Sequence, residues 1–332
     1  MRVGRRSARK PALGPPASTI PGVDRRRFLV RGAGALAALG LANRPVPALK
    51  FRRVRSDPPY RISLAQWSLH RTLRAGDLDP LDFPAFARDQ FGLDAVEYVN
   101  TFFADRARDH MYLDELRRRA DAAGVRSLLI MIDGEGRLGD PDSDARTRAV
   151  EQHHPWVDAA ARLGCHSIRV NAATEGPPGE AAALAADGLA RLTEYAVQPG
   201  LNVIVENHGG LSSDAAWLAG VIRRVDHPRC GTLPDFGNFT LADGSRYDAY
   251  RGVAELMPYA RAVSAKSYDF DAGGAETSID YRRMMRIVVG AGYRGYVGIE
   301  YEGTRLSEIE GIEATRDLLE TVRRELEADV EG

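Results

Sequence analysis

The stretch NVIVENHGG, at residues 202–210, places an acid and an imidazole directly after an apolar run. Such a run is typical of a buried strand. Glu206 and His208 follow at the point where this strand is expected to end. Because carboxylates and imidazoles are both common metal ligands, the pattern predicts a metal site at the end of a buried strand.

Two further carboxylates occupy the same kind of position, Asp235 in GTLPDF and Glu300 in VGIEYEG. Each ends an apolar run and so faces partly into a low dielectric. Three carboxylates that converge there would repel one another and raise their pKa values unless a cation lies between them. We therefore expect a divalent metal held by Glu206, Asp235, Glu300 and His208. Oxygen-rich ligands favour Mn²⁺ or Mg²⁺, with Co²⁺ and Zn²⁺ as alternatives.

These four residues also have structural interpretations. A carboxylate after a strand often caps the next helix, and Asp235 fits that interpretation best. Glu206 and Glu300 fit it less well, because the residues that follow them have no preference for a helix N-terminus. His208 is open to three interpretations: a ligand, a substrate contact or a loop histidine.

Five other residues near predicted strand ends are candidates for substrate binding: Trp67, Asn171, Asn238, Ser264 and Lys266. Trp67 either packs in the core or stacks on the apolar face of a sugar ring. Lys266 either pairs with a neighbouring acid or binds a substrate oxygen. The sequence leaves both alternatives open.

Eight strands alternate with eight helices along the chain. The strands are predicted at 61–68, 93–99, 125–132, 167–172, 202–207, 231–236, 261–267 and 295–301. The helices are predicted at 82–91, 112–123, 144–163, 179–197, 213–224, 247–257, 280–291 and 308–327. This alternation indicates a parallel sheet, and its length fits one α/β domain, a (β/α)8 TIM barrel over residues 61–328. Active sites of such barrels lie at the carboxyl ends of the strands, where the candidate residues are found.

The two cysteines, Cys165 and Cys230, lie at the starts of two strands that have a third strand between them. Second-neighbour strands are ~10 Å apart, which is too far for a disulfide. We expect both to be buried free thiols.

At four strand ends the chain resembles the xylose isomerase-like TIM barrel superfamily, the group of sugar-phosphate isomerase- and epimerase-like proteins. The motifs that carry the resemblance are VIVENHGG, GTLPDFGN, VSAKSYDFD and GYRGYVGIEYEG. Together with the strand order, they extend it over residues 60–327. A DNA-repair endonuclease with the same barrel is disfavoured, because it would need several strand-end histidines.

The resemblance implies that a metal is held from strands five to eight, at Glu206, Asp235, the position of Ser264, and Glu300. The family often has His-x-Lys where this chain has Ser264-Ala265-Lys266. The usual histidine ligand is therefore missing, while the lysine remains. Either His208 supplies the nitrogen, or water fills the position, or metal binding is weak or lost.

The family chemistry is proton transfer next to a sugar carbonyl, assisted by the metal. It implies a metal-dependent isomerase or epimerase in which Glu206 and Glu300 are both ligands and acid–base groups. On a 3-keto glycoside, the same proton abstraction would expel the aglycone, which makes a lyase or hydratase. The missing histidine motivates a third alternative, a non-catalytic carbohydrate-binding barrel. Since no glycine-rich phosphate cradle follows strand seven or eight, we expect a non-phosphorylated sugar or polyol as the substrate.

The start of the chain is basic, whereas the rest is acidic. Residues 1–44 carry +9 and the whole chain carries −1, so the remainder carries −10. An acidic body argues against a nucleic-acid partner, which would need a basic face. The family often forms dimers or tetramers, so a homo-oligomer is expected from the resemblance.

The basic start has its own interpretation. The stretch DRRRFLVRGAGALAALGLA, at 24–42, resembles a twin-arginine export signal, with Asp24 where Ser or Thr is more usual. Its apolar run is shorter than the ~20 residues that a membrane-spanning helix needs. We predict a leader at 1–44 and a linker at 45–60, with export by the twin-arginine machinery to the periplasm or outside the cell. A basic disordered tail is the alternative.

Overall fold

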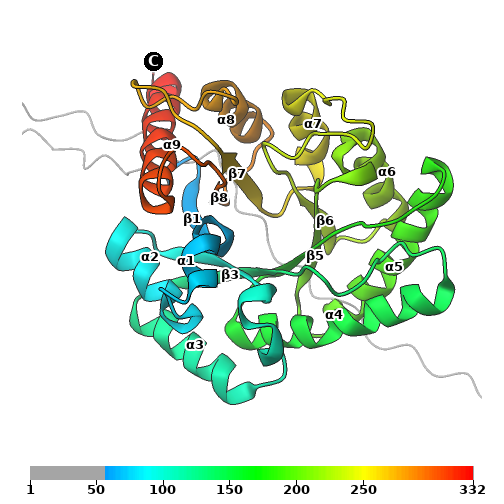
Figure 1. The fold of residues 1–332 in the computed structure, drawn as a ribbon. Coiled ribbons are helices and arrows are strands. Elements are labelled where there is room, and N and C mark those ends of the chain that lie inside the picture. Colours follow the sequence, from blue (N-terminus) through cyan, green and yellow to red (C-terminus); the bar gives the residue numbers. More distant parts are fainter. Residues whose placement is uncertain (1–56, 332) are drawn as a thin grey trace, which may run out of the picture. The chain divides into compact units, whose positions relative to one another are not determined.

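Eight parallel strands form the centre of the molecule, which is described here by a computed structural model covering residues 57–331. The strands are β1 (Arg61–Ala65), β2 (Ala95–Val99), β3 (Arg126–Met131), β4 (Ser167–Val170), β5 (Asn202–Glu206), β6 (Cys230–Leu233), β7 (Val263–Ser267) and β8 (Tyr296–Tyr301). They pair in the order β6-β5-β4-β3-β2-β1-β8-β7. The sheet curls on itself with helices on its outside (Figure 1), which confirms the predicted (β/α)8 TIM barrel.

Nine α-helices follow or precede these strands in the described residues. They are α1 (His70–Ala75), α2 (Phe83–Phe91), α3 (His110–Ala122), α4 (Ser143–Leu163), α5 (Pro178–Val197), α6 (Ala215–Val225), α7 (Ala249–Leu256), α8 (Tyr281–Gly290) and α9 (Glu308–Glu331). Five short 3₁₀ helices add η1 (Gln66–Leu69), η2 (Pro80–Asp82), η3 (Asn100–Arg106), η4 (Gly210–Ser213) and η5 (Met257–Tyr259). The eight predicted helices are all present, whereas α1 and the 3₁₀ helices were not predicted.

Aspartates start several of the helices. The carboxylates of Asp142, Asp214 and Asp280 accept hydrogen bonds from the first backbone N–H groups of α4, α6 and α8. Such caps satisfy donors that have no partner within the helix. At the other end of α2 and α4, Gly92 and Gly164 adopt the left-handed conformation that closes a helix. These signals mark where α4, α6 and α8 begin and where α2 and α4 end.

The strands β1 and β6 end three residues earlier than predicted, the largest such differences, and both have a local cause. β1 stops at Ala65 because the chain turns into η1, which carries Trp67 over the end of the barrel. β6 stops at Leu233, immediately before Pro234. A proline has no N–H to donate to a ladder, so regular pairing ends there.

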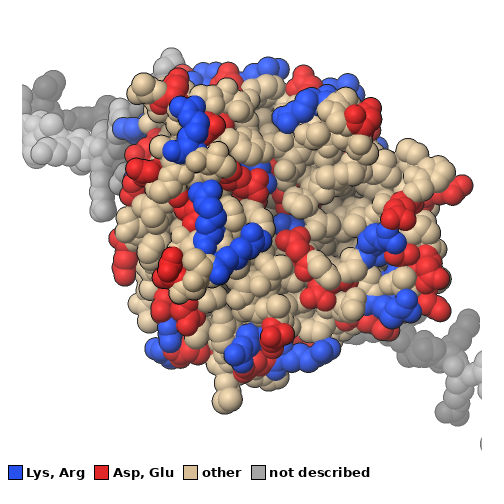
Figure 2. Space-filling model, in the orientation of Figure 1, with Lys and Arg blue, Asp and Glu red and all other residues tan. Residues whose placement is uncertain are grey.

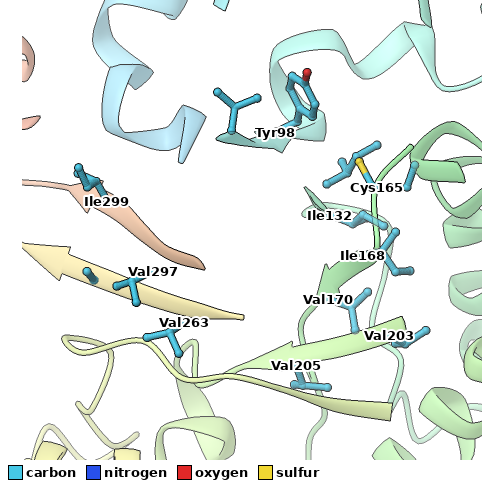
Figure 3. Close-up of a cluster of buried hydrophobic side chains, with 14 of the residues drawn as sticks. Tyr98, Ile132, Cys165, Ile168, Val170, Val203, Val205, Val263, Val297 and Ile299 are labelled. Atoms are coloured by element: carbon cyan, nitrogen blue, oxygen red, sulfur yellow. The ribbon is translucent and has the colours of Figure 1, made fainter. Parts of the chain in front are cut away.

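The alternation of side chains along the strands creates two apolar regions. The larger lies between the strands and the helices, where side chains such as Ile168, Val170 and Val203 are buried (Figure 3). The smaller fills the barrel interior with Ala65, Val99, Leu129, Met131, Ile204, Leu233 and Ala262. Because successive residues of a strand face opposite sides, a polar residue between two outward-facing ones must point into the barrel.

The barrel closes between β6 and β7, the first and last strands of the order. Isolated parallel bridges, Thr232 to Ala260 and Asp235 to Ser264, join them in place of a regular ladder. Backbone hydrogen bonds from Arg261 N to Thr232 O (3.0 Å) and from Ser264 N to Pro234 O (2.9 Å) complete this seam. We call the β6–β7 junction the seam below.

The remaining predictions concern the cysteines, membrane-spanning helices and the N-terminal segments. Cys165 and Cys230 are buried free thiols, as predicted. In residues 57–331, no helix is long and apolar enough to span a membrane. The predicted leader at 1–44 lies outside the described residues, as does most of the linker at 45–60. At the end of that linker, Tyr60 is buried and its hydroxyl donates to Leu319 O at 2.5 Å.

Candidate functional site

Three of the predicted carboxylates meet inside the barrel at the carboxyl ends of the strands. Glu206 is the last residue of β5, Asp235 lies two residues after β6, and Glu300 lies in β8. One oxygen from each is within 4.8 Å of an oxygen from each of the others. All three side chains are buried. We call these three residues the acid cluster.

Strand register explains why they converge. Glu206 pairs with Leu233, so Asp235 lies one inward-facing position further along β6. Asp235 then faces Ser264 across the seam, and Lys266 of β7 pairs with Glu300. Since the strands are parallel, their carboxyl ends reach the same side of the barrel, and inward-facing residues there share one space.

Ser264 lies between two members of the acid cluster. Its Oγ is 2.7 Å from Asp235 Oδ2 and 2.8 Å from Glu300 Oε2. A hydroxyl carries one proton and can donate to only one of these oxygens. The second contact therefore needs a proton from a carboxyl group.

The surroundings decide which carboxyl group that is. Burial raises the pKa of Asp235 to about 7, against the opposing charge of Lys266. Burial would also raise the pKa of Glu300, but Lys266 and Arg169 outweigh it and hold that pKa below its ordinary value. The contacts therefore fit a proton that Asp235 holds as long as no cation is bound, with Ser264 donating to an ionised Glu300.

Lys266 is the first of two buried cations beside the acid cluster. Its Nζ lies 3.2 Å from Glu300 Oε1, 3.3 Å from Glu302 Oε2 and 3.8 Å from Asp235 Oδ2. Burial opposes the charged form of Lys266, but the surrounding carboxylates raise its pKa well above the ordinary value. The lysine is therefore a fixed positive charge in the site.

Arg169 of β4 is the second buried cation, and the sequence analysis did not select it. Its Nη1 donates to Asp133 Oδ1 at 2.7 Å, and its Nε lies 2.8 Å from Glu206 Oε2. Burial raises the pKa of Glu206 to about 7, with Arg169 opposing that rise. Arg169 could have been predicted as a site residue, because it lies two residues before the candidate Asn171 and shares the inward face of β4 with it.

The remaining candidates lie around this centre. Asn238 Nδ2 donates to Glu206 Oε1 at 2.9 Å, and Asn171 Nδ2 donates to Asp133 Oδ1 at 2.8 Å. Trp67 is half-buried, and its Nε1 donates to Glu302 Oε1 at 2.6 Å. This tryptophan is thus linked to Lys266 through the two oxygens of Glu302.

His208 is not part of the acid cluster. β5 ends at Glu206, so His208 lies in the following loop, where it is exposed and its backbone N–H donates to Ser212 Oγ at 3.0 Å. Asn207, between them, is the residue that faces β6. Its Oδ1 accepts from Asp235 N at 2.8 Å and its Nδ2 donates to Asp235 O at 3.0 Å. Asn207 therefore fixes the backbone of Asp235.

The donor set fits a divalent cation. Five carboxylates pair with only two cations in these contacts, those of Asp133, Glu206, Asp235, Glu300 and Glu302 with Arg169 and Lys266. Among the described residues, Glu206 Oε2 is buried without a hydrogen-bond partner, since Arg169 Nε faces it in an unsuitable direction. An excess of buried negative charge and an unsatisfied oxygen are what a metal ion would balance.

The surface around this centre carries acidic and basic side chains in close mixture. Figure 2 shows both signs on one face of the molecule, in the orientation of Figure 1.

Comparison with known proteins places this geometry in a family. The family model described as a xylose isomerase-like TIM barrel matches residues 85–324. The chain belongs to this family.

Three known proteins are similar to this chain. A C-glycoside deglycosidase alpha subunit from Arthrobacter globiformis is 36% identical over 80 residues, which cover 23% of this chain and 23% of that protein. A 3-keto-D-glucoside 4-epimerase from E. coli has a similar structure, with a TM-score of 0.57 and 17% identity over 74% of this chain and 94% of that one. A xylose isomerase-like TIM barrel protein from Mycobacterium smegmatis, in complex with magnesium, has a TM-score of 0.59 and 16% identity over 80% and 96% of the two chains. The two structures share the fold with this chain.

Proposed function

We propose that this protein is a metal-dependent sugar isomerase or epimerase that moves a proton next to a carbonyl group. The observation that carries the proposal is the acid cluster, in which Glu206, Asp235 and Glu300 bring three oxygens within 4.8 Å in a buried site. The family membership supports the same reaction class, because structural neighbours include sugar epimerases.

Glu206 and Glu300 are the groups that would move the proton. They lie on β5 and β8, three strands apart, so they approach a bound sugar carbon from different sides. One carboxylate accepts the proton from the carbon next to the carbonyl, and the electron pair of the broken C–H bond forms an enediolate. The other carboxyl group returns a proton to the opposite face for epimerisation, or to the neighbouring carbon for isomerisation. A divalent cation held by the acid cluster supplies Lewis-acid polarisation of the carbonyl.

The chain's own cations support this chemistry. Lys266 holds Glu300 in the ionised form that can accept a proton. Arg169 forms an ion pair with Glu206 and with Asp133. Asn238 donates to the other oxygen of Glu206 and so sets the direction in which that carboxyl group points.

A neutral, non-phosphorylated sugar or polyol fits the site best. The acids around the centre outnumber the cations, which disfavours an anionic substrate. The loop DAGGAE, at 271–276, is built as a turn around its own aspartate. Asp271 Oδ1 accepts from Gly273 N at 2.8 Å and from Ala275 N at 3.0 Å, so these N–H groups are not free to cradle a phosphate.

Mn²⁺ or Mg²⁺ is the metal that we favour. Every ligand of the acid cluster is a carboxylate oxygen, and such oxygen donors suit these ions better than Zn²⁺ or Co²⁺. Substrate contacts from Trp67, Asn171 and Asn238 are part of the proposal, since these residues surround the cluster.

Metal content by elemental analysis is the direct test. Wild type should contain one divalent ion per chain, and Glu206→Gln together with Glu300→Gln should contain none while remaining folded. Wild type should then turn over a keto sugar or polyol in a screen. A folded wild type that binds no divalent ion would contradict the proposal and favour a non-catalytic carbohydrate-binding barrel.

A 3-keto-glycoside lyase or hydratase is the second candidate, favoured by the similarity to the C-glycoside deglycosidase alpha subunit. Here a carboxylate removes the proton next to the keto group, the C–H electrons form a double bond, and the bond to the aglycone breaks. The aglycone leaves and takes up a proton. Release of free aglycone from a 3-keto glycoside, measured by chromatography, separates this reaction from an epimerisation, which releases nothing.

Export by the twin-arginine machinery completes the proposed function and is supported by the stretch at 24–42. Arg25→Lys together with Arg26→Lys should keep the protein in the cytoplasm. Unchanged export of this variant, measured by cell fractionation, would exclude the signal. A homo-oligomer stays a prediction from the family, which light scattering on the purified protein would test.

A further inference from the structure

The seam and the acid cluster coincide in space, and one side chain belongs to both. Regular pairing between β6 and β7 is replaced by isolated bridges, one of which joins Asp235 to Ser264. Pro234 contributes only its carbonyl there, accepting from Ser264 N at 2.9 Å. The backbone alone therefore fixes Asp235 with fewer bonds than it would in a continuous ladder.

The carboxyl group of Asp235 is instead held through both of its oxygens. Its Oδ1 accepts from Gly237 N and Asn238 N, each at 2.8 Å. Its Oδ2, on the side of the acid cluster, has its shortest contact with Ser264 Oγ at 2.7 Å. Ser264 is thus the contact that sets where Oδ2 lies within the cluster.

The same hydroxyl also reaches the next strand. Ser264 Oγ lies 2.8 Å from Glu300 Oε2, so one oxygen atom joins β6, β7 and β8. Lys266, two residues along β7, contacts the same two carboxylates at the longer distances of 3.8 and 3.2 Å. The hydroxyl is the shorter and more directional of the two links.

We propose that Ser264 is a positioning residue that holds Asp235 and Glu300 across the seam at the spacing a hard divalent cation requires. This inference rests on the proposed metal site and names the residue that organises it. Ser264 is not needed for substrate contact in this role, because its hydroxyl is engaged by the two carboxylates. The cluster keeps an oxygen-only donor set, which favours Mn²⁺ or Mg²⁺ over metals that prefer nitrogen.

The test is Mn²⁺ binding by isothermal titration calorimetry, with MnCl₂ alone and the full-length chain. Ser264→Ala should weaken Mn²⁺ binding about tenfold, in the range found when residues that orient metal ligands are removed. Ser264→Thr keeps the hydroxyl and should bind within about threefold of wild type. If Ser264→Ala does not fold, the near-isosteric Ser264→Cys, a much weaker donor, should show the weakened binding.

Ser267 provides a matched control on the same strand. It is also buried, and its Oγ lies 2.7 Å from Thr315 Oγ1 on the outer side of the barrel. Ser267→Ala should lose stability but keep the Mn²⁺ affinity of wild type. A purely structural role for Ser264 predicts that both alanine variants behave alike.

The outcomes separate this inference from the proposed function. If wild type binds Mn²⁺ and the folded variant without the Ser264 hydroxyl binds it equally well, the positioning role is wrong and the metal site stands. If wild type binds no divalent ion, the proposed function itself fails. As an independent check, Ser264→His places an imidazole between the two carboxylates and should raise the Zn²⁺ affinity relative to Mn²⁺ by about tenfold or more; an unchanged ratio would contradict the placement of this residue in the cluster.

Discussion

Two buried carboxyl groups in the barrel interior each contact a serine hydroxyl, and their surroundings differ. On one side, Ser63 of β1 donates to Glu97 Oε1 of β2 at 2.7 Å. On the other, Ser264 contacts Asp235 at 2.7 Å. Burial raises the pKa of both acids to about 7. The contact between serine and carboxyl group is therefore nearly the same at Glu97 and at Asp235.

What differs is the number of charged groups in direct contact, since the charges of Glu300, Glu206 and Arg169 act on Glu97 only from a distance. Among the contacts of the described residues, Glu97 has no ion pair, and its Oε2 is buried without a hydrogen-bond partner. Its carboxyl group is accommodated by Gly298, where a Cβ would lie 2.6 Å from Glu97 Oε1. Asp235 instead shares its space with Glu206, Glu300 and the ammonium group of Lys266. A single buried acid can remain neutral, whereas a group of acids needs a cation.

The largest difference should appear when the acids are neutralised. Glu206→Gln and Glu300→Gln should each abolish metal binding and lower turnover by about 10²–10⁴-fold, the usual contribution of acid–base groups. Glu97→Gln should leave Mn²⁺ binding unchanged, because its carboxyl group lies outside the acid cluster. Calorimetry with MnCl₂ and a steady-state assay provide the measurements. Full turnover in both single variants would refute the assigned roles, and loss of metal binding in Glu97→Gln would erase the contrast between the two sides.

The second difference concerns the buried cation. Lys266→Met leaves the carboxylates of Asp235 and Glu300 without their nearest positive charge, and breaking a buried ion pair costs about 3–5 kcal/mol. The free energy of unfolding without metal should therefore fall by that amount, and saturating Mn²⁺ should restore part of it. Urea unfolding with and without MnCl₂ measures both effects.

A surface pair serves as the control for this variant. Arg282 Nη2 lies 2.8 Å from Glu325 Oε1, and the two side chains are 44% and 40% solvent-exposed. Arg282→Met should cost less than about 1 kcal/mol and show no response to Mn²⁺. Equal losses in the two variants would mean that Lys266 does not act as a counter-ion to the acid cluster.

The third difference concerns the share of the pH dependence of stability that Glu97 contributes. Its pKa rises from 4.5 to about 7 on folding, so the folded protein binds its proton more tightly than the unfolded chain does. This stabilisation is complete below pH 4.5 and is lost as the pH rises through 7. Relative to Glu97→Gln, wild type should therefore lose about 3 kcal/mol of unfolding free energy across that interval.

Comparing the two proteins removes the other titrating groups from this measurement. Glu206 and Asp235 are present in both, so the difference between the two urea-unfolding profiles reports Glu97 together with its weaker electrostatic coupling to Glu300 and Glu206. A difference that stays constant between pH 4.5 and 8 would show that Glu97 is solvated or ionised in the folded protein.

Much of the fold could be predicted from the sequence, because short-range patterns of residues determine its strands and helices. Apolar runs, each followed by a helical stretch, repeat eight times, and this alternation indicates a parallel barrel. The ends of β1 and β6 were predicted less well. Trp67 lies in a 3₁₀ turn, and Pro234 removes a ladder donor; in both cases the strand pattern continues after the pairing has stopped.

The candidate site was predicted where a side chain's direction follows from strand alternation. Glu206, Asp235 and Glu300 meet as expected. His208 lies in the loop after β5, where strand alternation no longer sets the direction of a side chain, so its role as a ligand stays a prediction. Arg169 was missed because its partners come from distant segments. The sequence shows a charged residue inside a strand, but it does not show which residues compensate for its burial.

The smallest expected effect compares the two serines themselves. Ser63→Ala removes one hydrogen bond to Glu97 and should cost about 1 kcal/mol of unfolding free energy, with no change in Mn²⁺ affinity. Ser264→Ala removes a hydroxyl of the same kind, yet it should weaken Mn²⁺ binding as well, because its two partners are metal ligands. Urea unfolding and calorimetry on both variants separate the cases. If Ser63→Ala also weakened Mn²⁺ binding, the two sides of the barrel interior would be coupled, and Glu97 would have to be counted among the groups that organise the metal site.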